Sequence, residues 1–434
     1  MMKKTNMLVT FAAFLTFSAW LWIAPEANAV PAFARQTGVA CSTCHFQHYP
    51  ALNAFGRAFK AGGYTQVGGQ SLIEGDDLSI PATLNASLVT KVRYQMTNGK
   101  DDTSTPTVNE SKVGKNKGEL QFPDEAALLI GGRAGEHVGF LLEAGLNVSA
   151  DAAATMFTSY KMPIVFDIGG PKLSIIPFTT DGLGASYGFE LLNTGAVRHQ
   201  RALEHRSETS AQQYIGTSGA AEGFAFVAYN ETGFINLTLW GPAHGTVATG
   251  FDLSQYVRVA ATPNVGGWDL GIGGQYWGGE TKVGDTDNTP SAIYATQAWA
   301  VDAQAQGNVG MPLGVYLSYG TAAASKDAKN GLADGTTKTS LFNANKNDKT
   351  AWSILAELGV LPGKATLAAG YRSGDNGAAA NNKEDAITGG ATYLLAQNVQ
   401  LQLNYTSYSG SARDKAVNSD EDNTLTTLML FAAF

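Results

Sequence analysis

The sequence predicts an all-β protein: a porin-like outer-membrane barrel of about sixteen antiparallel strands, preceded by a small helical segment that contains the only two cysteines of the chain. Three observations predict the barrel. Apolar and polar residues alternate with a period of two, short turns alternate with long polar loops, and the composition suits strands rather than membrane helices. The 434 residues include 50 glycines and 10% aromatics, and only 15% are charged. The mean hydropathy of -0.08 argues against a helical membrane protein.

Residues 1–29 have the features of a signal peptide. A positively charged start is followed by an apolar stretch over residues 7–24 and by the small-residue cleavage motif Ala27-Asn28-Ala29. We expect the mature chain to begin at Val30, with an uncleaved membrane helix as the alternative.

The mature chain would carry 27 basic and 36 acidic residues, because the signal peptide removes two lysines and one glutamate from the 29 basic and 37 acidic residues of the whole chain. This negative charge argues against nucleic acid as a partner and is compatible with cations.

The motif Cys41-Ser42-Thr43-Cys44-His45 lies shortly after the predicted signal peptide. It contains the only two cysteines of the chain. Two thiols at this spacing can bond to both vinyl groups of a haem, and the adjacent imidazole is then placed to bind the iron. A redox dithiol or half of a zinc site is the alternative, but no second cysteine pair exists and no βαβ pattern surrounds the motif. We therefore expect one covalently attached haem c, with His45 as the proximal ligand.

A short helix should follow the motif within the predicted haem segment, residues 30–75. Pro50 suits the first helical position, Gly62-Gly63 would end the helix, and apolar residues recur on one face at Leu52, Phe55 and Phe59. On its other faces, Arg57 and Lys60 could neutralise haem propionates or simply be solvated. The segment is too small to bury a haem alone, so the barrel lumen or rim is the expected second wall.

No motif assigns the distal haem ligand. His48 is disfavoured because it lies three residues after His45 on the same side of a helical turn, whereas a haem takes its axial ligands from opposite faces. Better candidates are His137, at a periplasmic turn with lumen-facing parity, and His199 and His205, in a long segment at 181–219 that could fold inward. The three methionines with the parity of apolar strand faces should touch lipid; they are Met96, Met156 and Met162.

The barrel is predicted over residues 76–434. Alternation is clear at 82–96, where Leu88 should face lipid and Lys91 the lumen. It recurs around residue 142, where Leu142 should face lipid and Glu143 the lumen. Sixteen strands are expected near residues 82–97, 119–134, 137–149, 155–168, 171–180, 220–230, 233–241, 253–262, 267–280, 293–306, 310–321, 348–360, 364–374, 385–396, 398–409 and 422–434.

The connections between these strands are of two kinds. Tight turns are expected at 135–136, 169–170, 231–232, 361–363 and 397, and longer polar loops near 98–118, 181–219, 281–292, 322–347 and 410–421. Short turns on one side and long loops on the other are typical of outer-membrane barrels, and the last strand ends in the aromatic Phe434. A soluble β-sandwich is the alternative.

Several acidic side chains offer oxygen ligands for a transiently held divalent cation, although ordinary surface charge explains them as well. They are the loop residues Asp101, Asp102, Asp285, Asp287, Asp420, Glu421 and Asp422, and the lumen-facing Glu143. No nucleophilic triad, phosphate loop or nucleotide fingerprint is present.

The runs 30–38, 41–50 and 51–64 together resemble the N-terminal signature of the fused cytochrome-porins, the monohaem outer-membrane iron oxidases of iron-oxidising bacteria. The resemblance is dense over residues 30–64 and rests only on architecture from 82 to 434. It implies that Cys41 and Cys44 hold a haem with His45 as its proximal ligand, in a periplasm-side segment that plugs a sixteen-stranded pore. It further implies an Fe(II):cytochrome c oxidoreductase that passes electrons from extracellular Fe(II) to a periplasmic cytochrome or another soluble carrier.

Two other functions are compatible with the sequence. The protein could be a passive outer-membrane porin whose haem segment is a sensor or a relic, or a soluble periplasmic electron-transfer cytochrome with another donor. Oxidation at the cell surface has a chemical rationale, because Fe(III) is insoluble near neutral pH.

Overall fold

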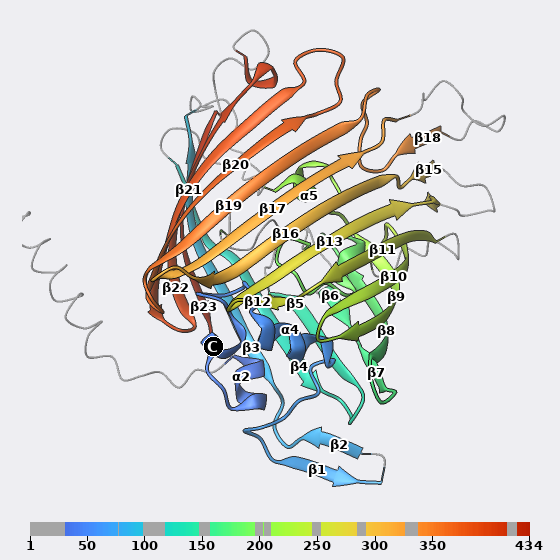
Figure 1. Cartoon of the computed structure of the whole chain (residues 1–434), viewed down its shortest axis with the longest axis vertical. Helices are drawn as coiled ribbons and strands as arrows, with labels where there is room; N and C mark the ends of the chain where they lie inside the picture. The colour runs from blue at the N-terminus through green and yellow to red at the C-terminus, as the bar shows by residue number, and fades with distance from the viewer. Residues whose placement is uncertain are drawn as a thin grey trace, which may run out of the picture.

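In the computed structural model the chain forms a closed antiparallel β-barrel with a short helical segment at one end (Figure 1). The structure describes residues 31–76, 78–98, 118–146, 157–195, 203, 210–244, 253–283, 292–325, 337–414 and 423–434. The predicted signal peptide and its cleavage site therefore lie outside the described residues.

Eighteen strand elements of the described chain close the barrel, and they occupy sixteen positions around it. Two positions are each made of two short elements, because β6 and β7 both pair with β8, and β11 and β12 both pair with β13. The elements are β3 (Ala86–Thr97), β4 (Glu119–Arg133), β5 (Gly139–Gly145), β6 (Phe157–Lys161), β7 (Ile164–Asp167), β8 (Lys172–Thr180), β9 (Ala221–Asn230), β10 (Gly233–Gly241), β11 (Ser254–Ala261), β12 (Asn264–Val265), β13 (Trp268–Gly278), β16 (Ala298–Asn308), β17 (Pro312–Ala322), β19 (Lys349–Leu361), β20 (Ala365–Asp375), β21 (Lys383–Ala396), β22 (Val399–Ser409) and β23 (Thr424–Ala433).

The prediction of an approximately sixteen-stranded barrel is confirmed, and the sandwich alternative is excluded by the single closed sheet. Every predicted strand overlaps an observed position. One predicted strand, 155–168, is divided at Pro163, which has no backbone N–H to donate to a ladder. The barrel closes where β23 pairs with β3, and Leu88 and Phe434 exchange two backbone hydrogen bonds of 2.7 and 3.0 Å.

Side chains alternate between the lumen and the outer surface as predicted. Lys91 is buried on the inner face of β3, whereas Leu88 is half-exposed with the opposite parity. On β19 the contrast is sharper: Trp352 is 45% exposed, while the adjacent Ser353 is 1% exposed. The outer surface is therefore largely apolar and the inner surface polar, which is the arrangement of an outer-membrane barrel.

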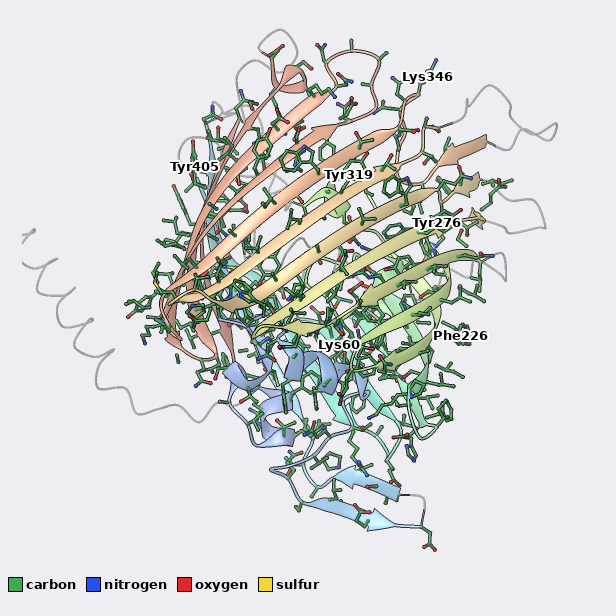
Figure 2. The ribbon with its side chains drawn as sticks, viewed as in Figure 1. Lys60, Phe226, Tyr276, Tyr319, Lys346 and Tyr405 are labelled. Atoms are coloured by element: carbon green, nitrogen blue, oxygen red, sulfur yellow. The ribbon has the colours of Figure 1, made fainter. Side chains whose placement is uncertain are left out.

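Aromatic side chains form a band around part of the outer surface (Figure 2). Tyr276 pairs in register with Trp299, and Tyr319 with Trp352. The rings of Trp299 and Tyr319 lie 5.3 Å apart, and those of Trp352 and Tyr371 lie 5.2 Å apart. Because Trp299 is the second residue of its strand, the band marks the ends of the strands that adjoin the long loops. Such girdles occur where a barrel meets the membrane interface.

The two ends of the barrel differ. All the predicted tight turns are found at one end, and the N-terminal segment and the C-terminus lie at that end (Figure 1). Near it the hairpin of β1 (Leu72–Gly75) and β2 (Leu78–Pro81) projects from the barrel, and it straddles the predicted boundary at residue 75. At the opposite end, a small sheet that was not predicted is formed by β14 (Glu280–Val283), β15 (Ala292–Ala295) and β18 (Thr337–Ser340).

The described parts of the 181–219 segment fold into the barrel, as the sequence suggested. They contain the one-turn helices η1 (Ala185–Tyr187) and α5 (Ala211–Tyr214). Leu191 and Leu192 pack in one buried cluster with Ala61 of the N-terminal segment and with the wall, and Tyr214 packs in another. This inward segment therefore fills part of the lumen. A further one-turn helix, η2 (Ser411–Arg413), follows β22.

Among the described helices, none is both long and apolar enough to cross a membrane.

Candidate functional site

The N-terminal segment consists of three short helices, α2 (Ala32–Thr37), α3 (Cys41–Cys44) and α4 (Ala54–Ala61). Helix α2 ends at Gly38 with φ 73°, a left-handed conformation that favours glycine, and a Cβ there would also approach the backbone of Gly69 to 3.0 Å. The guanidinium of Arg35 donates to the backbone carbonyl of Ala86 and so attaches α2 to β3. The start of the N-terminal segment is thus fixed to the barrel.

The single turn of α3 carries both cysteines, and His45 follows it in an extended conformation with φ -110° and ψ 135°. His45 then forms an isolated antiparallel bridge with Leu52. The flanking hydrogen bonds run from Phe46 N to Ala51 O at 2.8 Å and from Asn53 N to Cys44 O at 3.1 Å. Residues 45–52 therefore form a closed loop, which we call the His45 loop.

Helix α4 begins four residues later than predicted. Pro50 and Leu52 belong to the His45 loop, and the helix starts only after Asn53, whose side chain accepts from Gly56 N at 3.0 Å as an N-cap. The predicted end at Gly62 is correct.

Cys41, Cys44 and His45 all line one cavity of about 340 Å³ at the turn end of the barrel. Aromatic residues contribute much of its lining, namely Phe33, Tyr49, Phe59, Tyr64, Tyr187 and Phe431. The barrel provides the second wall, as predicted, with residues of β3, β4, β5, β6 and β23 and with the inward segment.

These residues fit a covalently attached haem. Both thiols and the following imidazole open onto the same largely apolar space. Gly56 also lies at this cavity, and a Cβ on it would come within 2.2 Å of the carbonyl oxygen of Cys44, so only glycine lets α4 approach the motif so closely.

Burial raises the pKa of both thiols, and for Cys44 the nearby Cys41 raises it further. Catalytic redox cysteines depend on a lowered pKa, because the thiolate is the reactive species. The environment of Cys41 and Cys44 therefore does not favour the dithiol alternative. Among the described residues, no group of three or more His, Cys, Asp and Glu side chains is arranged to hold a metal ion.

His48 is not among the residues that line the cavity, and it contacts the barrel wall instead. Its Nε2 is 2.5 Å from Glu357 Oε1 and its Nδ1 is 2.7 Å from the carbonyl oxygen of Tyr49, so both ring nitrogens face acceptors. Burial lowers the pKa of His48, but the charge and hydrogen bond of Glu357 outweigh it, so the pKa is raised. To bind iron, His48 would have to give up one of these contacts.

Arg57 makes a two-pronged ion pair with Asp269 of β13, at 2.8 and 2.6 Å, and is buried. The interpretation of Arg57 as a solvated residue is wrong, because the side chain is buried against a carboxylate distant in sequence. A role as a propionate partner stays a prediction. Lys60 does line the cavity.

The other candidate ligands are not brought to the cavity by the described structure. His137 lies exposed in the turn between β4 and β5 and is not among the cavity-lining residues. His199, His205, Met156 and the seven acidic loop residues lie outside the described residues. Met96 has the outward parity expected of it, and Glu143 lines the cavity.

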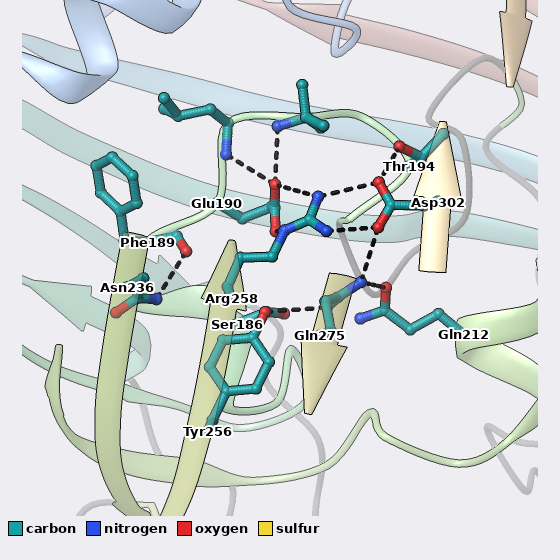
Figure 3. A network of polar contacts seen from close by, with 12 residues as sticks. Ser186, Phe189, Glu190, Thr194, Gln212, Asn236, Tyr256, Arg258, Gln275 and Asp302 are labelled. Atoms are coloured by element: carbon teal, nitrogen blue, oxygen red, sulfur yellow. Dashed lines mark hydrogen bonds and ion pairs between the residues drawn. The ribbon is translucent and has the colours of Figure 1, made fainter. Parts of the chain in front are cut away.

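A buried polar network in the lumen was missed by the sequence reasoning (Figure 3). Arg258 of β11, with no exposed side-chain surface, pairs with Glu190 of the inward segment at 2.9 Å and with Asp302 of β16 at 2.5 Å. The sequence indicates only that Arg258 and Asp302 occupy strand positions that face the lumen. The alternation of a strand does not reveal which charged side chains meet inside the barrel.

No protein-family model matches the chain, and no curated protein matches it in sequence. Solved structures resemble it in architecture. OmpT, an outer membrane protein of Vibrio cholerae, is 11% identical over 84% of this chain and 100% of that chain, with a TM-score of 0.45. The outer membrane channel DcaP of Acinetobacter baumannii is 13% identical over 81% of this chain and 97% of that chain, with a TM-score of 0.47. OccK1 of Pseudomonas aeruginosa is 12% identical over 80% and 98%, with a TM-score of 0.42. The function must therefore be argued from the residues of the chain itself.

Proposed function

We propose that the protein is an outer-membrane cytochrome-porin that oxidises extracellular Fe(II) and passes the electrons to a soluble periplasmic carrier. The observation that carries the proposal is that Cys41, Cys44 and His45 line one cavity enclosed between the N-terminal segment and the barrel. The resemblance of residues 30–64 to the fused cytochrome-porins supports the choice of Fe(II) as donor.

The residues of the cavity have distinct tasks in this proposal. Cys41 and Cys44 would form the thioether attachments of a bound haem, and His45 would bind its iron. Phe33 and Phe59, whose rings lie 5.2 Å apart, exclude water from the apolar part of the cavity, and Lys60 offers a positive charge to carboxylates. A bound haem supplies one-electron redox chemistry at this position.

The overall reaction balances one electron at a time. Outside the cell Fe(II) loses one electron to become Fe(III), and on the turn side of the barrel one carrier molecule gains that electron. Buried ion pairs hold the N-terminal segment to two different wall strands, through His48 with Glu357 and Arg57 with Asp269. A segment held in this way lets electrons cross while iron stays outside.

Proteoliposomes test this proposal directly. The protein is inserted with its long loops outward, and the vesicles contain either a soluble c-type cytochrome or a membrane-impermeant Fe(II) chelator. Anaerobic Fe(II) added outside should reduce the trapped cytochrome but give no colour with the trapped chelator. Cys44→Ala should abolish the reduction. Chelator colour without cytochrome reduction would support a passive porin instead.

A further inference from the structure

The inward segment touches the His45 loop through one buried side chain, Asn193. The Asn193 Oδ1 accepts from the backbone N–H of Leu52 at 2.9 Å, and its Nδ2 donates to the carbonyl oxygen of Leu52 at 3.1 Å. One side-chain amide thus satisfies both backbone groups of one residue, as a neighbouring β-strand would.

Leu52 is the residue that faces His45 across the antiparallel bridge. The hydrogen bonds on either side of the bridge belong to the neighbours of these two residues, so the backbone groups of Leu52 point away from His45. They point to Asn193. Asn193 therefore binds Leu52 on the side that faces away from His45, and so holds the bridge between Leu52 and His45 in place.

Asn193 is itself fixed to the barrel. Its backbone N–H donates to Gln304 Oε1 of β16 at 2.7 Å. One residue further along, the hydroxyl of Thr194 donates to Asp302 Oδ1 of the same strand at 2.6 Å. The segment that carries Asn193 is therefore attached to β16 at two consecutive residues.

The segment is also fixed on the other side of Asn193 (Figure 3). The Glu190 Oε1 accepts from the backbone N–H groups of Leu191 and Leu192 at 3.0 and 2.8 Å, and Glu190 pairs with Arg258 of β11. Hydrogen bonds of this charged type are stronger than neutral ones, and they are fully desolvated here. The barrel wall thus holds the segment rigid from Glu190 to Thr194.

We propose that Asn193 is a positioning residue for His45, transmitting the rigidity of the wall to the loop that holds the haem ligand. This inference rests on the proposed function only for its consequence at the haem. The contact itself is a property of the polypeptide. Without the Asn193 amide, the two backbone groups of Leu52 lose their partners and the His45 loop opens more often.

The test compares Asn193→Ala with Asn236→Ala in the full-length barrel. Asn236 of β10 is a matched control, because it is also buried and its Nδ2 donates to Phe189 O of the same inward segment at 3.1 Å, and within the described part of the chain it makes no hydrogen bond to the His45 loop. Gln304→Ala is a third variant, which removes only the acceptor of the Asn193 N–H and serves if Asn193→Ala does not fold.

The first readout is amide hydrogen exchange of peptides covering residues 44–53, measured on the purified full-length protein. Asn193→Ala should speed exchange there by about tenfold or more, Gln304→Ala by less, and Asn236→Ala only around residues 186–190. The second readout is the midpoint potential and the axial-ligand spectrum of the haem-loaded protein, which should change in Asn193→Ala and not in Asn236→Ala.

Equal exchange at residues 44–53 in wild type and Asn193→Ala would overturn the positioning role. So would equal changes in the Asn193 and Asn236 variants, because these would mean that loosening the inward segment anywhere has the same effect. If the exchange result holds but the purified protein carries no covalent haem, the proposed function fails while the contact between Asn193 and Leu52 stands.

Discussion

The imidazole of His48 and the carboxylate of Glu357 form a buried ion pair across 309 residues of sequence, with 2.5 Å between Nε2 and Oε1. The other ring nitrogen faces the carbonyl oxygen of Tyr49, which can only accept, so the protonated ring can donate at both nitrogens. The neighbouring Gln47 also donates to the backbone carbonyl of Glu357, at 3.1 Å. The His45 loop is therefore attached to β19 by charge as well as by hydrogen bonds.

This pair predicts that the docking of the N-terminal segment depends on pH. The pKa of His48 is raised above its ordinary value of 6.5 in the folded protein. A raised folded pKa gives stability that is full below the unfolded pKa and is lost as pH rises through the folded pKa. We expect proteolysis within residues 31–64 to be slowest in mildly acidic buffer and to accelerate on the alkaline side of the folded pKa.

The variants that test the pair are His48→Gln and Glu357→Gln. Each should flatten the pH profile, and removal of one partner of a buried pair should cost about 3–5 kcal/mol of docking stability. His244→Gln is the control, because His244 contacts Thr179 and Phe157 at the loop end of the barrel. An unchanged profile in His48→Gln would show that another group controls the pH dependence.

The Arg57–Asp269 pair predicts that Asp269→Asn loosens α4 from the wall. The variant weakens a buried two-pronged ion pair, so the segment should leave the barrel mouth more often. Planar-bilayer recordings should show larger or more frequent conductance steps than the wild type. Asp167→Asn, at an exposed turn carboxylate, should behave like the wild type. Equal conductance in all three proteins would contradict the anchoring role.

Gly56→Ala should lower the yield of covalent haem, because the added Cβ would come within 2.2 Å of Cys44 O and displace the motif. Helix propensity alone predicts the opposite, since alanine stabilises a helix by about 1 kcal/mol relative to glycine. Gly62→Ala is the matched control, with its Cβ 3.3 Å from the nearest atom, Ala58 O. Haem staining of gels measures the yield. Equal staining of both variants would mean that the approach of α4 is not needed.

Leu317→Arg should destabilise the barrel by about 2–4 kcal/mol, because Leu317 is exposed on the outer face in the middle of β17. Leu361→Arg, at the turn end of β19, should cost about 0–1 kcal/mol because it lies near the interface. Urea unfolding in lipid vesicles measures both. Similar costs at the two depths would contradict the membrane placement. Leu88 is a poorer probe than its lipid-facing parity suggests, since it pairs with the terminal Phe434 at the turn end.

The strands were predictable because their signal is local. Alternation with a period of two and glycine- or proline-rich turns are read within ten residues, so all sixteen positions and the tight turns were found. The cysteine-histidine motif is equally local. The start of α4 was not predictable, because Leu52 pairs with His45 in a bridge, and this tertiary contact overrides the local helix propensity of Leu52.

The contacts that hold the candidate site were beyond sequence reasoning for a different reason. Arg57 meets Asp269, and Asn193 meets Leu52, only because the closed barrel brings distant strands and the inward segment together. The alternation of residues along a strand predicts which side chains face the lumen, but it does not predict which lumen residue each side chain will contact. Charged lumen residues such as Arg258 could therefore be predicted to face inward, whereas the network around Arg258 could not.

The most direct test of the proposed function is a stopped-flow trace of haem absorbance in detergent-purified protein mixed with anaerobic Fe(II). We expect that Fe(II) reduces a single covalent haem, that Cys41→Ala and Cys44→Ala lose covalent attachment, and that His45→Ala alters the redox behaviour even where haem is retained. A haem that dithionite reduces but that excess Fe(II) leaves oxidised at every pH tested would contradict the iron-oxidase proposal and leave the barrel fold intact.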